Sequence, residues 1–166
     1  MKGPAGVTVC VIERSLLERI PAGLPPMLDY RTHIRARSNY NTPPVFGIYV
    51  MTLVTRWVRD RVGGVPAMAA MNAAKAGRLY ASLDGLGELV QTHAQPRWRS
   101  AMNACFRFAD PRLDARFLEE SAAAGFSGLG GHRALGGLRA SLYNAVPAAA
   151  VEQLCEFLVE FAARHA

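Results

Sequence analysis

A glycine-rich segment near the C-terminal end carries the residues best suited to chemistry. It runs Gly130-Gly131-His132-Arg133-Ala134-Leu135-Gly136-Gly137-Leu138-Arg139. An arginine guanidinium is a planar fork that matches a carboxylate or a phosphate and stays charged at any working pH. Glycines let the backbone approach a ligand closely and adopt positive φ angles. The segment predicts a pocket for a small dianion, held by His132, Arg133 and Arg139. A tight turn between two strands, with solvated arginines, is the alternative.

A second candidate binding segment is Asn41-Thr42, followed by Pro43-Pro44. Proline is tolerated in the first turn of a helix, so these residues predict a helix start. A side-chain amide and a hydroxyl at a helix N-terminus form a natural phosphate seat, helped by the helix dipole. Alternatively, Thr42 is only the N-cap of that helix.

Basic residues also gather between Asp29 and Tyr40, a segment that predicts a loop or extended chain. Aromatic residues beside basic ones could form a nucleic-acid arm, but a solvated surface loop is the simpler interpretation. The chain has 19 Lys and Arg against 13 Asp and Glu, a net charge of +6. Because the arginines are spread along the chain, this charge favours neither nucleic acid nor an anionic metabolite.

Composition excludes several classes of protein. Hydrophobic residues make up 51% of the chain and charged residues 19%, which excludes a disordered polyelectrolyte. The three cysteines form no CxxC pair, and the other histidines lack metal-ligand spacing, so we expect no metal site. No signal-type segment and no apolar run of about 20 residues occurs, so we expect a soluble, cytoplasmic protein without membrane contact.

The elements that must position these residues follow from periodicity and chain breakers. The apolar run Val7–Ile12 predicts a buried strand. An apolar stripe that includes Trp57 predicts a helix that starts at the Asn41-Thr42-Pro43-Pro44 signal and ends at Gly63-Gly64, the expected domain boundary. Beyond the boundary we expect an α+β series. Its elements are a helix at 66–83, a strand at 99–108, a helix at 113–124, a strand at 139–143 and a helix at 147–163; a short helical turn at 13–20 precedes the boundary.

Taken in order, several short motifs resemble the phosphoserine aminotransferase family. They are Gly3-Pro4-Ala5-Gly6, Met27-Leu28-Asp29-Tyr30, Asn41-Thr42-Pro43-Pro44, Arg99-Ser100-Ala101-Met102-Asn103, Phe117-Leu118-Glu119-Glu120, Gly131-His132-Arg133 and Gly136-Gly137-Leu138-Arg139-Ala140-Ser141-Leu142-Tyr143-Asn144-Ala145. No single motif is decisive, but the ordered set is specific and extends over almost the whole chain.

The resemblance implies the C-terminal part of a fold-type I, pyridoxal-phosphate-dependent transferase. This α/β chain would comprise the end of the large cofactor domain (1–63) and an α+β small domain (64–166). The family forms homodimers and converts phosphoserine and 2-oxoglutarate to 3-phosphooxypyruvate and glutamate; in many bacteria it also serves pyridoxine biosynthesis. By this resemblance Asn41 and Thr42 bind the cofactor phosphate of the neighbouring subunit, Arg139 holds the substrate α-carboxylate, and His132 and Arg133 help hold the distal phosphate or carboxylate.

The sequence also departs from the family. The family's Schiff-base lysine stands two residues before the Gly-Pro-Ala-Gly motif, whereas Lys2 directly precedes Gly3. Gly130 replaces a lysine of the family pattern. The aspartate that partners the pyridine nitrogen and the aromatic residue stacked on the ring have no counterpart here. We therefore assign no catalytic residue and expect the chain alone to be inactive. A non-catalytic module that binds a phosphorylated metabolite or a partner subunit remains the alternative.

Overall fold

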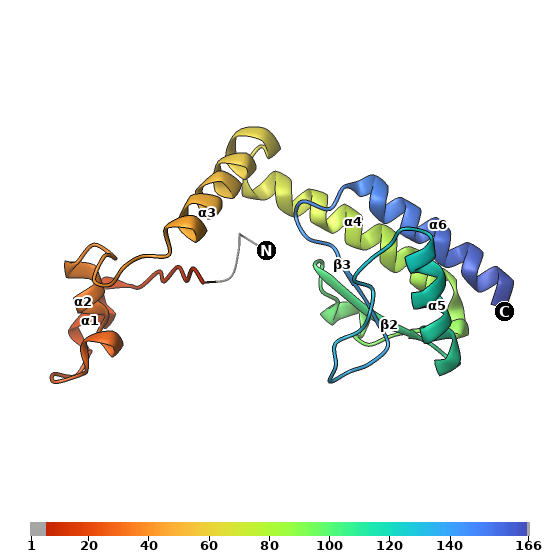
Figure 1. The fold of residues 1–166 in the computed structure, drawn as a ribbon, viewed down its shortest axis with the longest axis horizontal. Coiled ribbons are helices and arrows are strands. Elements are labelled where there is room, and N and C mark those ends of the chain that lie inside the picture. Colours follow the sequence, from red (N-terminus) through yellow and green to blue (C-terminus); the bar gives the residue numbers. More distant parts are fainter. Residues whose placement is uncertain (1–5, 166) are drawn as a thin grey trace. The chain divides into compact units, whose positions relative to one another are not determined.

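The structure, a computed structural model, contains two compact units. It describes residues 6–165, so Lys2 and Gly3-Pro4-Ala5 lie outside the described residues. Unit 1 spans Met1–Arg61 and unit 2 spans Val62–Ala166. Figure 1 shows helices in the first unit and helices around a small sheet in the second. The division between Arg61 and Val62 lies close to the predicted boundary at Gly63-Gly64, and the assignment of the units to a large and a small domain stays a prediction.

Unit 1 consists of short helices joined by irregular chain. Its elements are α1 (Arg14–Glu18), the 3-10 turn η1 (Pro26–Leu28), α2 (Tyr30–Arg35) and α3 (Val45–Trp57). The predicted buried strand is wrong, because Val7–Ile12 is not a strand and Val11 is 96% exposed. A buried parallel strand needs neighbouring strands and covering helices, and residues 6–61 contain no strand that could pair with it.

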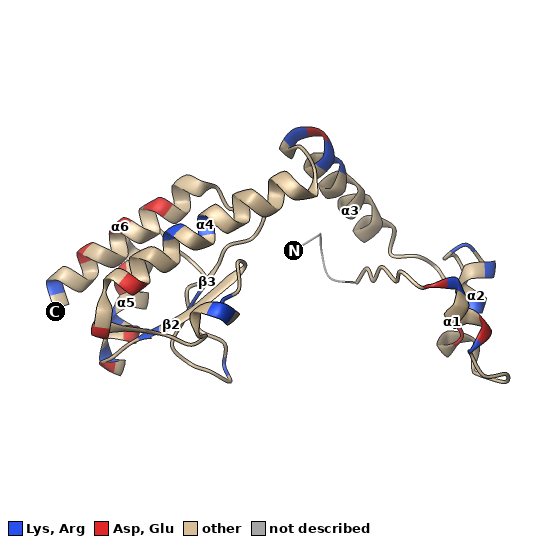
Figure 2. Ribbon diagram, turned by 180° about the vertical axis from the view of Figure 1, so that it is seen from behind, with Lys and Arg blue, Asp and Glu red and all other residues tan. Residues whose placement is uncertain are grey.

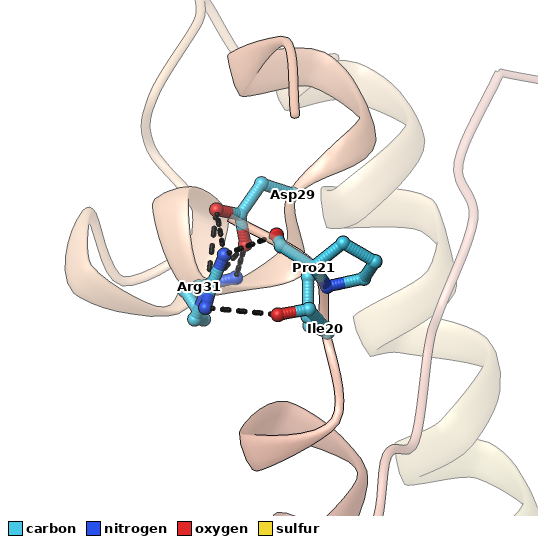
Figure 3. Close-up of polar contacts among 4 residues, drawn as sticks. All are labelled: Ile20, Pro21, Asp29 and Arg31. Atoms are coloured by element: carbon cyan, nitrogen blue, oxygen red, sulfur yellow. Dashed lines mark hydrogen bonds and ion pairs between the residues drawn. The ribbon is translucent and has the colours of Figure 1, made fainter. Parts of the chain in front are cut away.

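The prediction of a loop between Asp29 and Tyr40 is also wrong, because α2 forms there. The Asp29 carboxylate accepts the Arg31 amide hydrogen at 2.9 Å and caps the helix N-terminus. The Arg31 guanidinium also donates to Asp29 and to the carbonyls of Ile20 (3.3 Å) and Pro21 (3.1 Å), as Figure 3 shows. Arg31 therefore ties α2 to the preceding turn, a structural role that a solvated or nucleic-acid-binding arm would not require.

Helix α3 begins later than the sequence suggested. Its N-cap is Pro44, and no side chain caps it, so Thr42 is not the N-cap. The helix continues into a π-helical turn, η2 (Val58–Val62), and ends at Gly63 and Gly64, whose φ angles are 95° and 92°. The predicted apolar stripe is present but little buried, since Phe46 is 73% exposed and Trp57 36%.

Unit 2 is a three-stranded antiparallel sheet with helices packed on it. Its elements are α4 (Val65–Gly85), η3 (Gly87–Leu89), β1 (Val90–Thr92), η4 (Pro96–Trp98), β2 (Asn103–Phe108), α5 (Pro111–Ala123), β3 (Leu138–Ser141) and α6 (Ala148–His165). The strand order is β1-β2-β3. The helices and the two longer strands were predicted, with small shifts in their ends. Strand β1 was missed, because three residues carry too little alternation to be recognised.

The core lies between the sheet and the helices of unit 2. Along β2, the buried residues Ala104, Phe106 and Phe108 alternate with more exposed ones, as expected for a sheet with one covered face. Phe117 of α5 and Phe161 of α6 pack on Phe108, with ring centroids 5.5 Å and 5.2 Å away. In Figure 2 the ribbon positions of Lys and Arg are distributed over several helices and interleaved with those of Asp and Glu. No helix within residues 6–165 is long and apolar enough to span a membrane.

Candidate functional site

Arg139 occupies the middle of β3, where strand geometry decides which way its side chain points. Its neighbours Leu138 and Ala140 are buried in the core, so Arg139 and Ser141 lie on the opposite face of the strand. Cys105 of β2 is its cross-strand partner. The Nε atom of Arg139 is buried and has no hydrogen-bond partner within the described part of the chain. A buried donor without a partner is costly, so a ligand oxygen that accepts from it would recover that free energy.

A pocket of about 420 Å³ lies beside this arginine. It is lined by residues 126–129, by residues 139–143 and by Val146 and the first two turns of α6. Most of its wall is apolar, and Ser127, Ser141 and Tyr143 are among its lining residues. Ligand pockets of roughly 300–1,000 Å³ with a few placed polar groups are typical of small-molecule sites. A pocket of this size with an arginine among its lining residues suits a small organic anion.

The glycine-rich segment is a tight hairpin whose base is the start of β3. Gly130 pairs with Leu138, and the Gly131 amide donates to the Gly137 carbonyl at 2.9 Å. Gly137 has a φ of 63°, and a Cβ there would come within 2.8 Å of the Phe106 carbonyl oxygen. Glycine is therefore required at 137 both for backbone conformation and for space. The alternative of a tight turn correctly describes the local backbone, and it does not exclude anion binding.

His132 and Arg133 lie at the exposed tip of this hairpin. The His132 Nδ1 accepts the Ala134 amide hydrogen at 3.2 Å, which leaves Nε2 available. The guanidinium of Arg107 on β2 donates to the Leu135 carbonyl at 3.2 Å and so anchors the tip. One hairpin thus carries all three candidate residues of unit 2. Arg139 lines the pocket from the base, and no hydrogen bond within residues 6–165 joins it to His132 or Arg133.

Asn41 and Thr42 lie in unit 1, on the exposed segment before α3. The Asn41 amide nitrogen is 3.2 Å from the Met27 sulfur, and the amide oxygen remains available. Because Thr42 does not cap α3, its hydroxyl is not used by the helix. Helix N-termini attract anions through unpaired N–H groups and the helix dipole. These two side chains at the start of a 13-residue helix therefore fit a phosphate group.

Lys75 is a functional candidate that the sequence did not single out. It is 4% exposed, and its ammonium donates to the carbonyls of Tyr143 (2.8 Å) and Val146 (3.0 Å). Burial lowers the pKa of this ammonium. The available signal was rarity, because 17 of the 19 basic residues are arginine and only Lys2 and Lys75 are lysine. A lysine at position 75 of such an arginine-rich chain suggests a role that an arginine, with its larger guanidinium, would fill less well.

Comparison with known proteins identifies the family. The family model described as Aminotransferase class-V matches residues 1–154. The chain belongs to this family. The phosphoserine aminotransferase of Geobacillus kaustophilus is 51% identical over 164 residues, which cover 99% of this chain and 45% of the relative. That of Lysinibacillus sphaericus is 48% identical, with 98% and 45% covered. The chain therefore spans a little less than half the length of these relatives.

Solved structures agree with the sequence comparison. A phosphoserine aminotransferase structure that concerns radiation damage of its Schiff base matches with a TM-score of 0.92 and 41% identity, over 98% of this chain and 45% of that one. A phosphoserine aminotransferase from Trichomonas vaginalis with bound pyridoxal phosphate matches with a TM-score of 0.76 and 34% identity, over 84% and 40%. The predicted fold class, part of a pyridoxal-phosphate-dependent transferase, is confirmed.

Proposed function

We propose that this chain is the C-terminal part of a phosphoserine aminotransferase that serves serine biosynthesis. The reaction is the exchange of an amino group between phosphoserine and 2-oxoglutarate, giving 3-phosphooxypyruvate and glutamate. The related phosphorylated substrate of pyridoxine biosynthesis belongs to the same proposal, as does a cytoplasmic location. Family membership and relatives about half identical support it. The observation that carries it is the buried, unpartnered Nε of Arg139, a residue that lines a pocket of substrate size.

Arg139 would hold the α-carboxylate of the substrate. A carboxylate has two coplanar oxygens, and the guanidinium can meet both through parallel N–H donors. The surrounding apolar wall reduces competition from water, which strengthens a charged hydrogen bond. The carboxylate would also supply the partner that Nε lacks. The α-carboxylate is common to phosphoserine, glutamate and 2-oxoglutarate, so one arginine can serve both half-reactions.

His132 and Arg133 would hold the distal phosphate or carboxylate of the substrate. The two side chains offer an imidazole Nε2 and a full guanidinium on a tip held by Arg107. A phosphate monoester carries more charge than a carboxylate and accepts several charged hydrogen bonds. Because the tip is exposed, its preference between the two groups depends on how many donors reach each of them.

Asn41 and Thr42 would bind the cofactor phosphate of the neighbouring subunit in a homodimer. Both side chains are exposed before α3, so their donors and acceptors can face another chain. Pyridoxal phosphate supplies the electron sink for amino-group transfer, while the protein supplies binding and orientation. Under this proposal residues 1–63, which include unit 1, end the large cofactor domain, and residues 64–166, nearly all of unit 2, form the small domain.

The chain alone is expected to be catalytically inactive. A Schiff-base lysine must present its amine to an open site. Lys75 cannot do so, because its ammonium is buried and donates to two carbonyls. Lys2 lies outside the described residues, one position before Gly3. A module that binds a phosphorylated metabolite or a partner subunit without catalysis is the second candidate. Transamination by the purified 166-residue chain with added pyridoxal phosphate would contradict the expected inactivity.

Calorimetric titration of the chain with O-phospho-L-serine tests the proposed site. We expect saturable binding that Arg139→Gln weakens by roughly ten-fold or more, because a charged hydrogen bond contributes about 1.5–3 kcal/mol. The matched control is Arg112→Gln, which removes one charge from a side chain that is 90% exposed and remote in sequence from the pocket. Absence of binding, or equal binding by the Arg139→Gln variant, would overturn the assignment.

A further inference from the structure

The turn that follows β3 is held from inside unit 2 by polar residues of α4. Lys75 donates to the Tyr143 and Val146 carbonyls, as described above. One helical turn earlier, the Asn72 side-chain amide donates to the Asn144 side-chain oxygen at 2.8 Å. We call Asn72, Lys75 and Asn144 the α4 clasp. Residues three apart share one face of a helix, so the two α4 side chains reach the same turn.

The turn has further internal order. The Val146 amide donates to the Tyr143 carbonyl at 2.9 Å, so that carbonyl accepts from both Val146 and Lys75. Just before it, the Leu142 amide donates to the Met102 carbonyl at 2.7 Å and fixes the end of β3 to the chain before β2. The conformation of residues 142–146 is therefore specified at both ends.

This turn is part of the Arg139 pocket. Tyr143 and Val146, whose carbonyls Lys75 binds, both line that pocket. Arg139 is four residues before Tyr143 on the same continuous segment. A shift of the turn would therefore change the pocket wall and the frame that carries the guanidinium. Main-chain carbonyls held by a buried donor move little, because breaking the bonds leaves buried polar groups unpaired.

The α4 clasp holds the turn with buried polar groups, and burying them costs free energy. Lys75 is 4% exposed, and no ion pair within residues 6–165 includes it. The Asn72 side-chain oxygen is also buried without a hydrogen-bond partner. Burying an ammonium and an unpaired amide oxygen costs free energy that an apolar side chain would not. The simplest explanation is that these residues fix the position of the turn beside the Arg139 pocket.

We propose that Lys75 is a positioning residue for anion binding by Arg139, acting with Asn72 and Asn144 through the Tyr143–Val146 turn. The inference rests on the proposed function for the identity of the ligand, a phosphorylated amino acid. The α4 clasp touches no ligand itself. It holds one wall of the pocket where the Arg139 guanidinium can meet the carboxylate without rearrangement, and preorganisation of this kind raises affinity.

The test is titration of the full 166-residue chain with O-phospho-L-serine in four backgrounds. Lys75→Met keeps the length and apolar stem of the side chain but removes its donors and charge. We expect it to weaken binding roughly ten-fold, because displacing a binding group by about an ångström has effects of at least this size. Asn144→Ala removes the hydrogen bond from Asn72 to the same turn and changes no charged group, so we expect a smaller loss of affinity. Arg112→Met is the charge-matched control and should bind like the parent chain.

A double-mutant cycle separates positioning from a general structural role. Lys75→Met is also introduced into Arg139→Lys, which keeps a cation but loses the planar fork. If the α4 clasp acts through the Arg139 guanidinium, Lys75→Met should cause little or no further loss of affinity in the Arg139→Lys background. An undiminished loss there overturns the proposal, as does parent-like affinity in both Lys75→Met and Asn144→Ala.

Two further outcomes keep the test decisive. If circular dichroism shows that Lys75→Met does not fold, the cycle is run with Asn144→Ala, and the same two results support or overturn the proposal. If the parent chain itself does not bind O-phospho-L-serine, the proposed function fails and this inference falls with it. Binding by the parent chain with no effect of the α4 clasp removes only the inference.

Discussion

Units 1 and 2 differ most in what they bury. The buried hydrophobic cluster of the described residues lies entirely in unit 2, between Ala76 and Phe161. Within residues 6–61 of unit 1 the buried residues are Asp29 and Gly47, and apolar side chains such as Phe46 on α3 are exposed. A unit with its own core specifies its own structure, whereas exposed apolar side chains in number mark surfaces that favour association. The candidate substrate residues lie in unit 2, which has its own core, and the candidate cofactor residues lie in unit 1, whose apolar side chains are exposed.

The largest expected effect tests this difference with two phenylalanines. Phe117→Ala removes a fully buried ring that packs on Phe106, Phe108, Phe157 and Phe161. We expect a loss of about 3–5 kcal/mol in the free energy of unfolding, the usual cost of such a cavity. Phe46→Ala, on a side chain that is 73% exposed, should change it by less than about 0.5 kcal/mol. Urea unfolding followed by circular dichroism measures both.

An equal loss in the two variants would contradict the comparison. It would mean that Phe46 is covered in solution, for example by a second copy of the chain. Light scattering on the parent chain tests for that case, because it measures association directly. The exposed apolar segment Val7–Ile12 is a second reason to expect association.

Sequence reasoning succeeded where short-range signals determine structure. In unit 2 the helix predicted at 113–124 is α5 (Pro111–Ala123), which Asp110 caps and Gly125 follows, since capping depends on residues adjacent in the chain. In unit 1 the same type of signal was overlooked at Asp29, whose cap starts α2. The strand prediction for Val7–Ile12 was wrong for a different reason. Its composition favours a strand, but strand formation requires pairing partners that composition cannot supply.

The candidate site divides in the same way. Residue types predicted an anion pocket that includes Arg139; the structure places Arg139 at the edge of a pocket, and its binding of an anion stays a prediction. The role of Lys75 was not predictable, since it depends on carbonyls 68 and 71 residues away in the sequence. Nor could the sequence decide between Thr42 and Pro44 as the N-cap of α3, because helix ends are uncertain by one or two residues.

A smaller effect concerns the carboxylate that joins α5 to the end of α6. Glu120 accepts from Arg116 (2.9 Å), Arg164 (2.8 Å) and His165 (3.2 Å). These partners, Arg116 first, lower the pKa of Glu120 from 4.5 to about 2. A carboxyl group whose pKa is lower in the folded state stabilises the fold above the unfolded pKa. That stabilisation is lost as the pH falls from about 4.5 through about 2.

Glu120→Gln removes this dependence. Between pH 5 and pH 2 its melting temperature should fall less than that of the parent chain, because the neutral amide binds no proton. Other carboxylates with lowered pKa values, such as Asp84 beside Arg99, contribute to both chains and cancel in the difference. Glu119→Gln, an exposed neighbour, is the matched control and should follow the parent. Parallel curves for the parent and Glu120→Gln would show that the Glu120 ion pairs add nothing to unit 2 in solution.

The smallest effect distinguishes two helix starts in unit 1. Asp29→Ala removes the only side-chain cap of α2 and part of the anchor for Arg31, so we expect it to cost about 1 kcal/mol in local stability. Thr42→Ala should leave α3 unchanged within about 0.5 kcal/mol, because Pro44 is the N-cap and no side chain caps the helix. Hydrogen exchange measures this directly at the amides of Ala36 and Ser38, which donate to Thr32 and His33 of α2, and at the Ile48 amide of α3. If Thr42→Ala instead speeds exchange at Ile48, the threonine caps the helix after all, and a hydroxyl used in that way would be poorly placed to bind a cofactor phosphate.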